Sequence, residues 1–75
     1  MDINDFLKKV AEQYDETEMS AFTPQTRFKE LADWSSLIAL SIIAMIDEDY
    51  NISLKSEDLA KSETIEDLFC RISQR

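Results

Sequence analysis

Two adjacent serines, Ser35 and Ser36, are the residues of this 75-residue sequence best placed to take part in chemistry. They precede a nearly continuous apolar run, and serine is a preferred N-cap because its hydroxyl accepts from a free N–H group of the first helical turn. If Ser35 caps the helix, the Ser36 hydroxyl is not needed for capping. At the first helical position, free N–H groups and the helix dipole favour an attached or bound anion. A phosphate ester on Ser36 is therefore chemically reasonable.

Other reactive residue types are scarce. The chain has no glycine for a phosphate-cradling loop and no histidine, the commonest general base. One cysteine, Cys70, gives neither a Cys-His pair nor a zinc set, and we expect it to pack against the side of a helix. The paired acidic residues stand in short polar stretches and are expected to be surface charge. We therefore expect no catalytic site, no metal site and no enzyme.

The composition limits the partners. Sixteen acidic and eight basic residues give a net charge of −8, which disfavours nucleic acid and anionic membranes and favours basic patches on proteins. A chain of this length is expected to form one domain, residues 1–75, and a monomer. The first ten residues show neither a secretory nor a transit pattern, so we expect a cytoplasmic location.

The elements that position the serines centre on residues 34–50. Residues 37–46 are apolar except Ser41, far short of the roughly 20 that a membrane span needs. One row at helical spacing is expected to face the core: Leu37, Leu40, Ile43, Ala44 and Ile46. A second row is either buried or open to a partner: Ile38, Ile42 and Met45. The helix ends in Asp47, Glu48 and Asp49, which serve either recognition or solubility.

The remaining chain predicts an all-α fold: a small four-helix bundle with three longer helices, one short third helix, and a long loop between helices one and two. Asp2 caps a first helix that buries Ile3, Phe6, Leu7, Val10 and Tyr14. Phe22, Phe28 and Leu31 tie down the loop of residues 15–33, in which Thr23 and Pro24 are an alternative start for a short helix. Residues 50–54 form a packed loop.

The last two helices have their own start signals. Ser56 caps the short third helix, with Leu59 and Ala60 facing inward. Thr64 caps the last helix, with Asp67 three residues on in a capping-box arrangement. Its buried stripe consists of Ile65, Leu68, Phe69 and Ile72.

These features together resemble the acyl carrier protein family. Ser36-Leu37 stand at the Ser-Leu of the family's Asp-Ser-Leu motif, and the register continues through the helix into Tyr50-Asn51-Ile52-Ser53-Leu54. Thr26-Arg27-Phe28-Lys29-Glu30-Leu31 upstream and Thr64-Ile65 downstream are also similar to family positions. The resemblance implies a 4′-phosphopantetheine arm on Ser36, which holds an acyl or aminoacyl cargo as a thioester. Fatty acid, polyketide and nonribosomal biosynthesis all remain open.

The chain departs from the family at two positions. Ser35 replaces the aspartate that helps the transferase, leaving Asp33 two residues further back, and Ile38 replaces a common acidic recognition residue. The implied partners are a phosphopantetheinyl transferase and enzymes with basic patches that load or use the acyl group. They would contact Ser35, Leu37, Ile38, Ile42, Met45, Asp47 and Glu48. The alternative is an unmodified acidic interaction module that uses the same helix.

Overall fold

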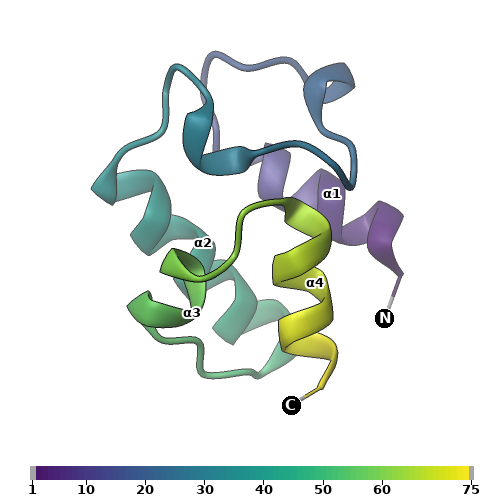
Figure 1. The fold of residues 1–75 in the computed structure, drawn as a ribbon, viewed down its shortest axis with the longest axis vertical. Helices are drawn as coiled ribbons and strands as arrows, with labels where there is room; N and C mark the ends of the chain where they lie inside the picture. Colours follow the sequence, from purple (N-terminus) through teal and green to yellow (C-terminus); the bar gives the residue numbers. More distant parts are fainter. Residues whose placement is uncertain (1, 75) are drawn as a thin grey trace.

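The computed structural model describes residues 2–74, which fold into helices joined by loops (Figure 1). The α-helices are α1 (Ile3–Ala11), α2 (Ser36–Tyr50), α3 (Ser56–Ala60) and α4 (Ile65–Ser73). Two 3₁₀ helices, η1 (Met19–Ala21) and η2 (Phe28–Glu30), lie between α1 and α2. The predicted all-α bundle, with a short third helix and a long loop between the first two, is confirmed.

The core is built from one face of each α-helix. Asp2 caps α1 as predicted, because its carboxylate accepts from the Asn4 N–H at 3.0 Å. α1 packs against α4, and α3 packs against both α2 and α4. The Phe6 ring lies 5.5 Å from Phe69 and 6.0 Å from Tyr50, measured between ring centroids. The buried faces predicted for the first and last helices are confirmed, with Ile3 and Phe69 at the partly buried margin.

The connection between α1 and α2 passes over one end of the bundle (Figure 1). Aromatic residues tie it down as expected: Tyr14 packs on Phe22, and the Tyr14 hydroxyl donates to the main-chain carbonyl of Phe28 at 2.7 Å. Burial raises the pKa of Tyr14 above its ordinary value, which keeps the hydroxyl protonated as a donor. The long loop is therefore an ordered part of the fold.

The expected alternative of a short helix at Thr23 and Pro24 is wrong. These residues begin a turn, in which the Thr26 hydroxyl accepts from the Thr23 N–H at 2.8 Å. Main-chain carbonyls of this turn also accept hydrogen bonds from the start of α4. The Ile65 N–H donates to the Thr26 carbonyl at 3.1 Å, and the Glu66 N–H donates to the Pro24 carbonyl at 2.9 Å. The turn thus satisfies N–H groups at the start of α4 that have no partner within the helix.

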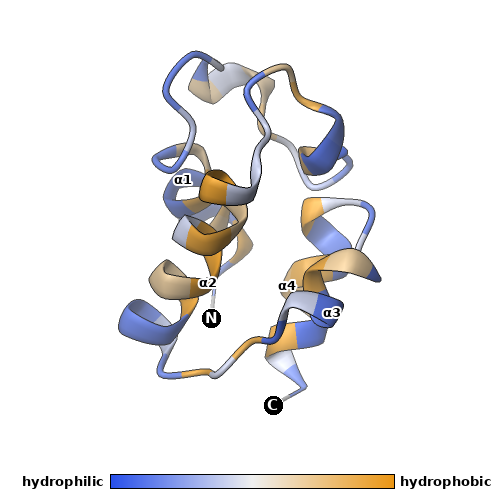
Figure 2. Ribbon diagram, turned by 90° about the vertical axis from the view of Figure 1, so that its left-hand side faces the viewer, coloured by the Kyte–Doolittle hydropathy of each residue, from blue (hydrophilic) through white to orange (hydrophobic). Residues whose placement is uncertain are grey.

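α2 is rotated relative to the prediction. The expected core-facing row is wrong at Leu37 and Leu40, which are 72% and 62% exposed, and at Ala44, which is also exposed. Ile46 is buried and Ile43 partly buried, as that row predicts. The other core positions of α2 are Ile38, Ile42 and Met45, which belong to the second row. Both rows have helical spacing, and Figure 2 shows apolar residues along most of α2. Packing against the other helices decides which row is buried.

α2 ends and α3 begins through local hydrogen bonds. Asn51 adopts a left-handed conformation with φ of 56° and donates from its N–H to the Asp47 carbonyl at 3.0 Å. The cap predicted at Ser56 is displaced by one residue, because Lys55 is the N-cap and its N–H donates to the Asp58 carboxylate at 3.0 Å. Leu59 is buried as expected, but Ala60 is exposed. The packed loop predicted at residues 50–54 lies at residues 51–55, because Tyr50 is the last residue of α2, and Leu54 is buried in it.

α4 starts with the predicted capping box. The Thr64 hydroxyl accepts from the Asp67 N–H at 3.1 Å, and the Asp67 carboxylate accepts from the Thr64 N–H at 3.2 Å. Cys70 was expected to pack on the side of a helix, but it is exposed. The capping residues could be assigned from sequence because their bonding is local, whereas the outward position of Cys70 depends on how α4 is docked.

Candidate functional site

Ser36 is the first residue of α2, and its side chain is exposed. The cap is supplied by Ser35, as predicted, because the Ser35 hydroxyl accepts from the Ile38 N–H at 3.3 Å. Within residues 2–74 the Ser36 side chain makes no hydrogen bond. Its hydroxyl is therefore accessible and is not required to hold the helix start.

A hollow of about 520 Å³ opens beside Ser36. We call it the Ser36 groove. It lies between α2 and α3, below the end of the long connection, and its lining is Lys29, Trp34, Ser36, Ala39, Leu40, Ile43, Ser56, Leu59 and Ala60. The lining is mainly apolar. The exposed hydroxyl and a cavity able to accept an apolar group are thus next to each other.

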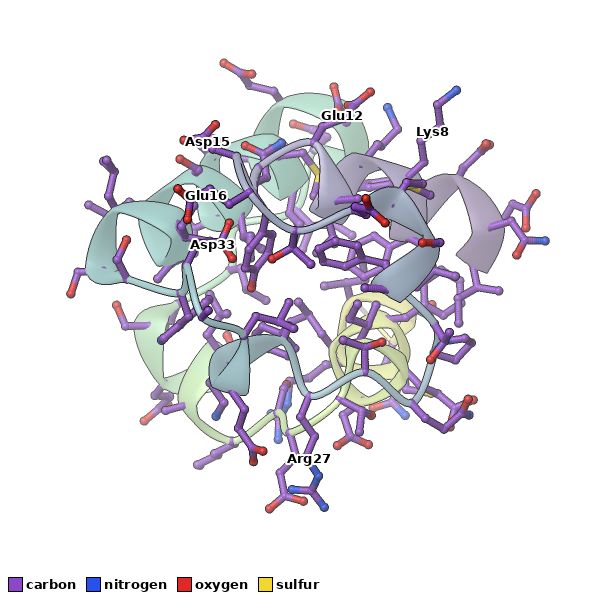
Figure 3. All side chains as sticks on the ribbon, turned by 90° about the horizontal axis from the view of Figure 1, so that it is seen from above. Lys8, Glu12, Asp15, Glu16, Arg27 and Asp33 are labelled. Carbon is purple, nitrogen blue, oxygen red and sulfur yellow. The ribbon has the colours of Figure 1, made fainter. Side chains whose placement is uncertain are left out.

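Asp33 has a structural role in the loop. Its two carboxylate oxygens accept from the Glu16 N–H at 3.1 Å and from the Thr17 hydroxyl at 2.6 Å. Figure 3 shows Asp33 beside Glu16, on the side of the molecule away from Arg27. The hydrogen bond from Thr17 holds the pKa of Asp33 below its ordinary value. The acidic residue closest before Ser36 is therefore engaged in joining the two ends of the long connection.

The residues expected to contact partners fall into two groups. Ser35, Leu37, Asp47 and Glu48 are exposed. The expected apolar docking row is wrong, because Ile38, Ile42 and Met45 are only 7%, 0% and 6% exposed and belong to the core.

Leu40 takes the place of that row on the exposed face, and sequence reasoning missed it. Leu37 and Leu40 lie on the N-terminal half of α2, one helical turn apart, and Asp47 and Glu48 lie near its C-terminal end. Asp49 is engaged elsewhere, in an ion pair of 3.2 Å with Lys9. The outward face of α2 is therefore apolar next to Ser36 and acidic at the far end.

Comparison with known proteins identifies the class of site. The family model described as a phosphopantetheine attachment site matches residues 5–69. The chain belongs to this family. Its members are non-catalytic carriers with a covalently attached 4′-phosphopantetheine, and they interact with modifying and biosynthetic enzymes. Searches of curated proteins and of solved structures each found no match.

The residues of the site fit such a cofactor. A phosphopantetheine arm requires an accessible hydroxyl, and Ser36 is exposed at the start of a helix, where a phosphate is favoured by the dipole. The adjacent groove can receive an apolar group, and Lys29 adds a cation to its lining. Within residues 2–74, no helix combines the length and apolar character needed to cross a bilayer.

Proposed function

We propose that this chain is a single carrier domain that bears its phosphopantetheine arm on Ser36 and delivers an acyl or aminoacyl cargo to partner enzymes. The observation that carries the proposal is the exposed Ser36 hydroxyl, which Ser35 relieves of the capping role and which opens onto an apolar groove. The arm supplies a terminal thiol for the thioester. Ser36 Oγ forms the phosphodiester link, and the rest of the domain presents it.

The groove supports transient shelter of the cargo. Leu40 and Ile43 line it together with Leu59 and give it apolar walls. Ile46 and Ile65, which belong to the core, are fully buried and lie outside the lining. A cargo that enters beside Ser36 would therefore meet the outer parts of α2 and α3 without displacing the innermost core.

We propose the outward face of α2 as the contact surface for partners, which include a phosphopantetheinyl transferase and the enzymes that load and use the cargo. Leu37 and Leu40 supply apolar contact area close to Ser36, and Asp47 and Glu48 supply negative charge for a basic patch. Such complementary charge chiefly speeds and selects the encounter, and salt weakens it. We also propose that the protein is a monomer and that it is located in the cytoplasm.

Intact mass after co-expression with a broad-specificity phosphopantetheinyl transferase tests the attachment residue. We expect the mass of one arm to be added to the wild type and to Ser35→Ala, and to be absent from Ser36→Ala. A gain that persists in Ser36→Ala but disappears in Ser35→Ala would assign the arm to the neighbouring serine. No gain with several transferases would favour an unmodified interaction module, although the row expected to dock its partner is buried in the core.

A further inference from the structure

Lys29 ties the connection before α2 to the end of α3. Its ammonium donates to the main-chain carbonyl of Ala60 at 2.8 Å, across 31 residues of sequence. Ala60 is the last residue of α3, and carbonyl groups at a helix C-terminus lack helical partners and carry the negative end of the dipole. The side chain thus joins η2 to one wall of the Ser36 groove.

The same lysine shares that groove with Ser36. Both residues belong to its lining, and Lys29 is the basic residue among them; the others are apolar or carry a hydroxyl. α2 itself contains no lysine or arginine. Positive charge in the lining of the groove therefore comes from Lys29.

A phosphodiester on Ser36 changes the balance of attractions on Lys29. It adds a full negative charge to a chain whose net charge is already −8, whereas the Ala60 carbonyl offers only a partial charge. At the same distance, a full negative charge attracts the ammonium more strongly than the partial charge of a carbonyl oxygen does. The phosphodiester is therefore the better acceptor for the ammonium wherever both lie within its reach.

On the premise that Ser36 bears the arm, we propose that Lys29 is an arm-positioning residue. Its ammonium leaves the Ala60 carbonyl and pairs with the phosphodiester on Ser36. This exchange holds the base of the arm over the groove and, at the same time, frees the C-terminal end of α3. Because Leu59 and Ala60 form part of the groove wall, attachment of the arm also makes the groove easier to widen for cargo.

The test compares unmodified and modified forms of the wild type, Lys29→Met, Lys29→Arg and Lys61→Met. Lys61 is a matched control, since it is an exposed lysine next to Ala60 that lines a different hollow. The ³¹P chemical shift of the phosphodiester reports the pairing directly. Amide hydrogen exchange at Lys61 and Ser62, which donate to the carbonyls of Glu57 and Leu59, reports the end of α3.

We expect the ³¹P resonance to move in Lys29→Met but to stay near the wild-type position in Lys29→Arg and Lys61→Met. Modification should speed exchange at the two amides about two- to fivefold in the wild type, which corresponds to the loss of one exposed hydrogen bond of about 0.5–1 kcal/mol. It should have no such effect in Lys29→Met, where the tie is already absent. An unchanged ³¹P shift in Lys29→Met, or equal effects of modification on exchange in both proteins, would overturn the proposal.

Intact mass separates this proposal from the one on which it rests. If the arm is attached at Ser36 but the ³¹P and exchange results go against Lys29, only the positioning role is refuted. If no mass is added, or if it persists in Ser36→Ala, the attachment residue is refuted and the role of Lys29 falls with it.

Discussion

Replacing Ser35 with aspartate is expected to strengthen the start of α2 and to speed attachment of the arm. Ser35 has an extended backbone and an exposed side chain, and its hydroxyl lies 3.3 Å from the Ile38 nitrogen. That distance is beyond the usual 2.7–3.2 Å of such hydrogen bonds. Aspartate caps helices about as well as serine, and its charge adds about 0.3–1 kcal/mol at a helix N-terminus. We expect Ser35→Asp to raise the free energy of unfolding by that amount at pH 7.

Ser35→Ala provides the opposite change at the same position. It removes the acceptor, and because the present hydrogen bond is long, we expect a cost of about 0.5–1 kcal/mol, in the lower part of the range for lost caps. Urea unfolding followed by fluorescence measures both effects, since the chain's one tryptophan, Trp34, precedes the cap. For a domain of this size, 1 kcal/mol corresponds to about 4–8 °C in Tm.

The pH dependence identifies the source of the gain in Ser35→Asp. A helix N-terminus lowers the pKa of the introduced carboxyl group in the folded state, so its contribution is present above the unfolded value, about 3.9, and is lost as the pH falls below it. The resemblance to the family also implies faster transfer of the arm by the same transferase. A Ser35→Asp protein less stable than wild type, or a Ser35→Ala protein of unchanged stability, would refute the assigned cap. An unchanged transfer rate would refute the implied aid to the transferase.

Three further predictions concern the fold around the site. Tyr14→Phe leaves the Phe28 carbonyl without its donor and should cost about 1–3 kcal/mol. Because the Tyr14 pKa is raised, its stabilising effect is lost as the pH rises above about 10, where the unfolded chain ionises. Urea unfolding should show a larger alkaline loss in the wild type than in Tyr14→Phe, in which burial also raises the pKa of Tyr50 and leaves part of the loss. Asp33→Asn should make the free energy of unfolding, measured with urea, fall less steeply as the pH is lowered. The Asp33 pKa is lowered in the folded protein, so in the wild type its contribution disappears as the pH falls below about 4. The same acid dependence in both proteins would contradict the loop contact. Leu37→Ala should change the free energy of unfolding by no more than about 0.5 kcal/mol because Leu37 is exposed, whereas Ile42→Ala should cost about 2–5 kcal/mol in the same assay because Ile42 is buried. Similar values for the two variants would contradict the rotation of α2.

Features that depend on neighbouring residues could be predicted from sequence. Ser35 and Thr64 were assigned as caps because each bonds to an N–H group three residues further along. The face that α2 turns to the core could not be predicted, since both of its apolar rows have helical spacing. For this reason Leu40 was expected in the core and Ile42 was left open between the core and a partner, whereas the fold exposes the first and buries the second.

Polar contacts between residues far apart in the chain gave no signal in the sequence. The bond from Lys29 to Ala60 spans 31 residues, and nothing in the type or spacing of the two predicts it. Asp33 stands two residues before Ser35, and nothing in the sequence indicates that donors 16 and 17 residues upstream engage its carboxylate. Such pairings follow from the path of the connection over the bundle, which the local pattern of residues does not determine.

The way the long connection is fastened also indicates where the protein can be labelled. Its carbonyls at Pro24 and Thr26 are bound to α4, so an insertion there would disturb two helices at once. η1 carries no buried side chain, and Met19 points outward. Figure 1 shows η1 on the other side of the molecule from the start of α2. A fluorophore or surface anchor at η1 would therefore leave visiting enzymes an unobstructed approach.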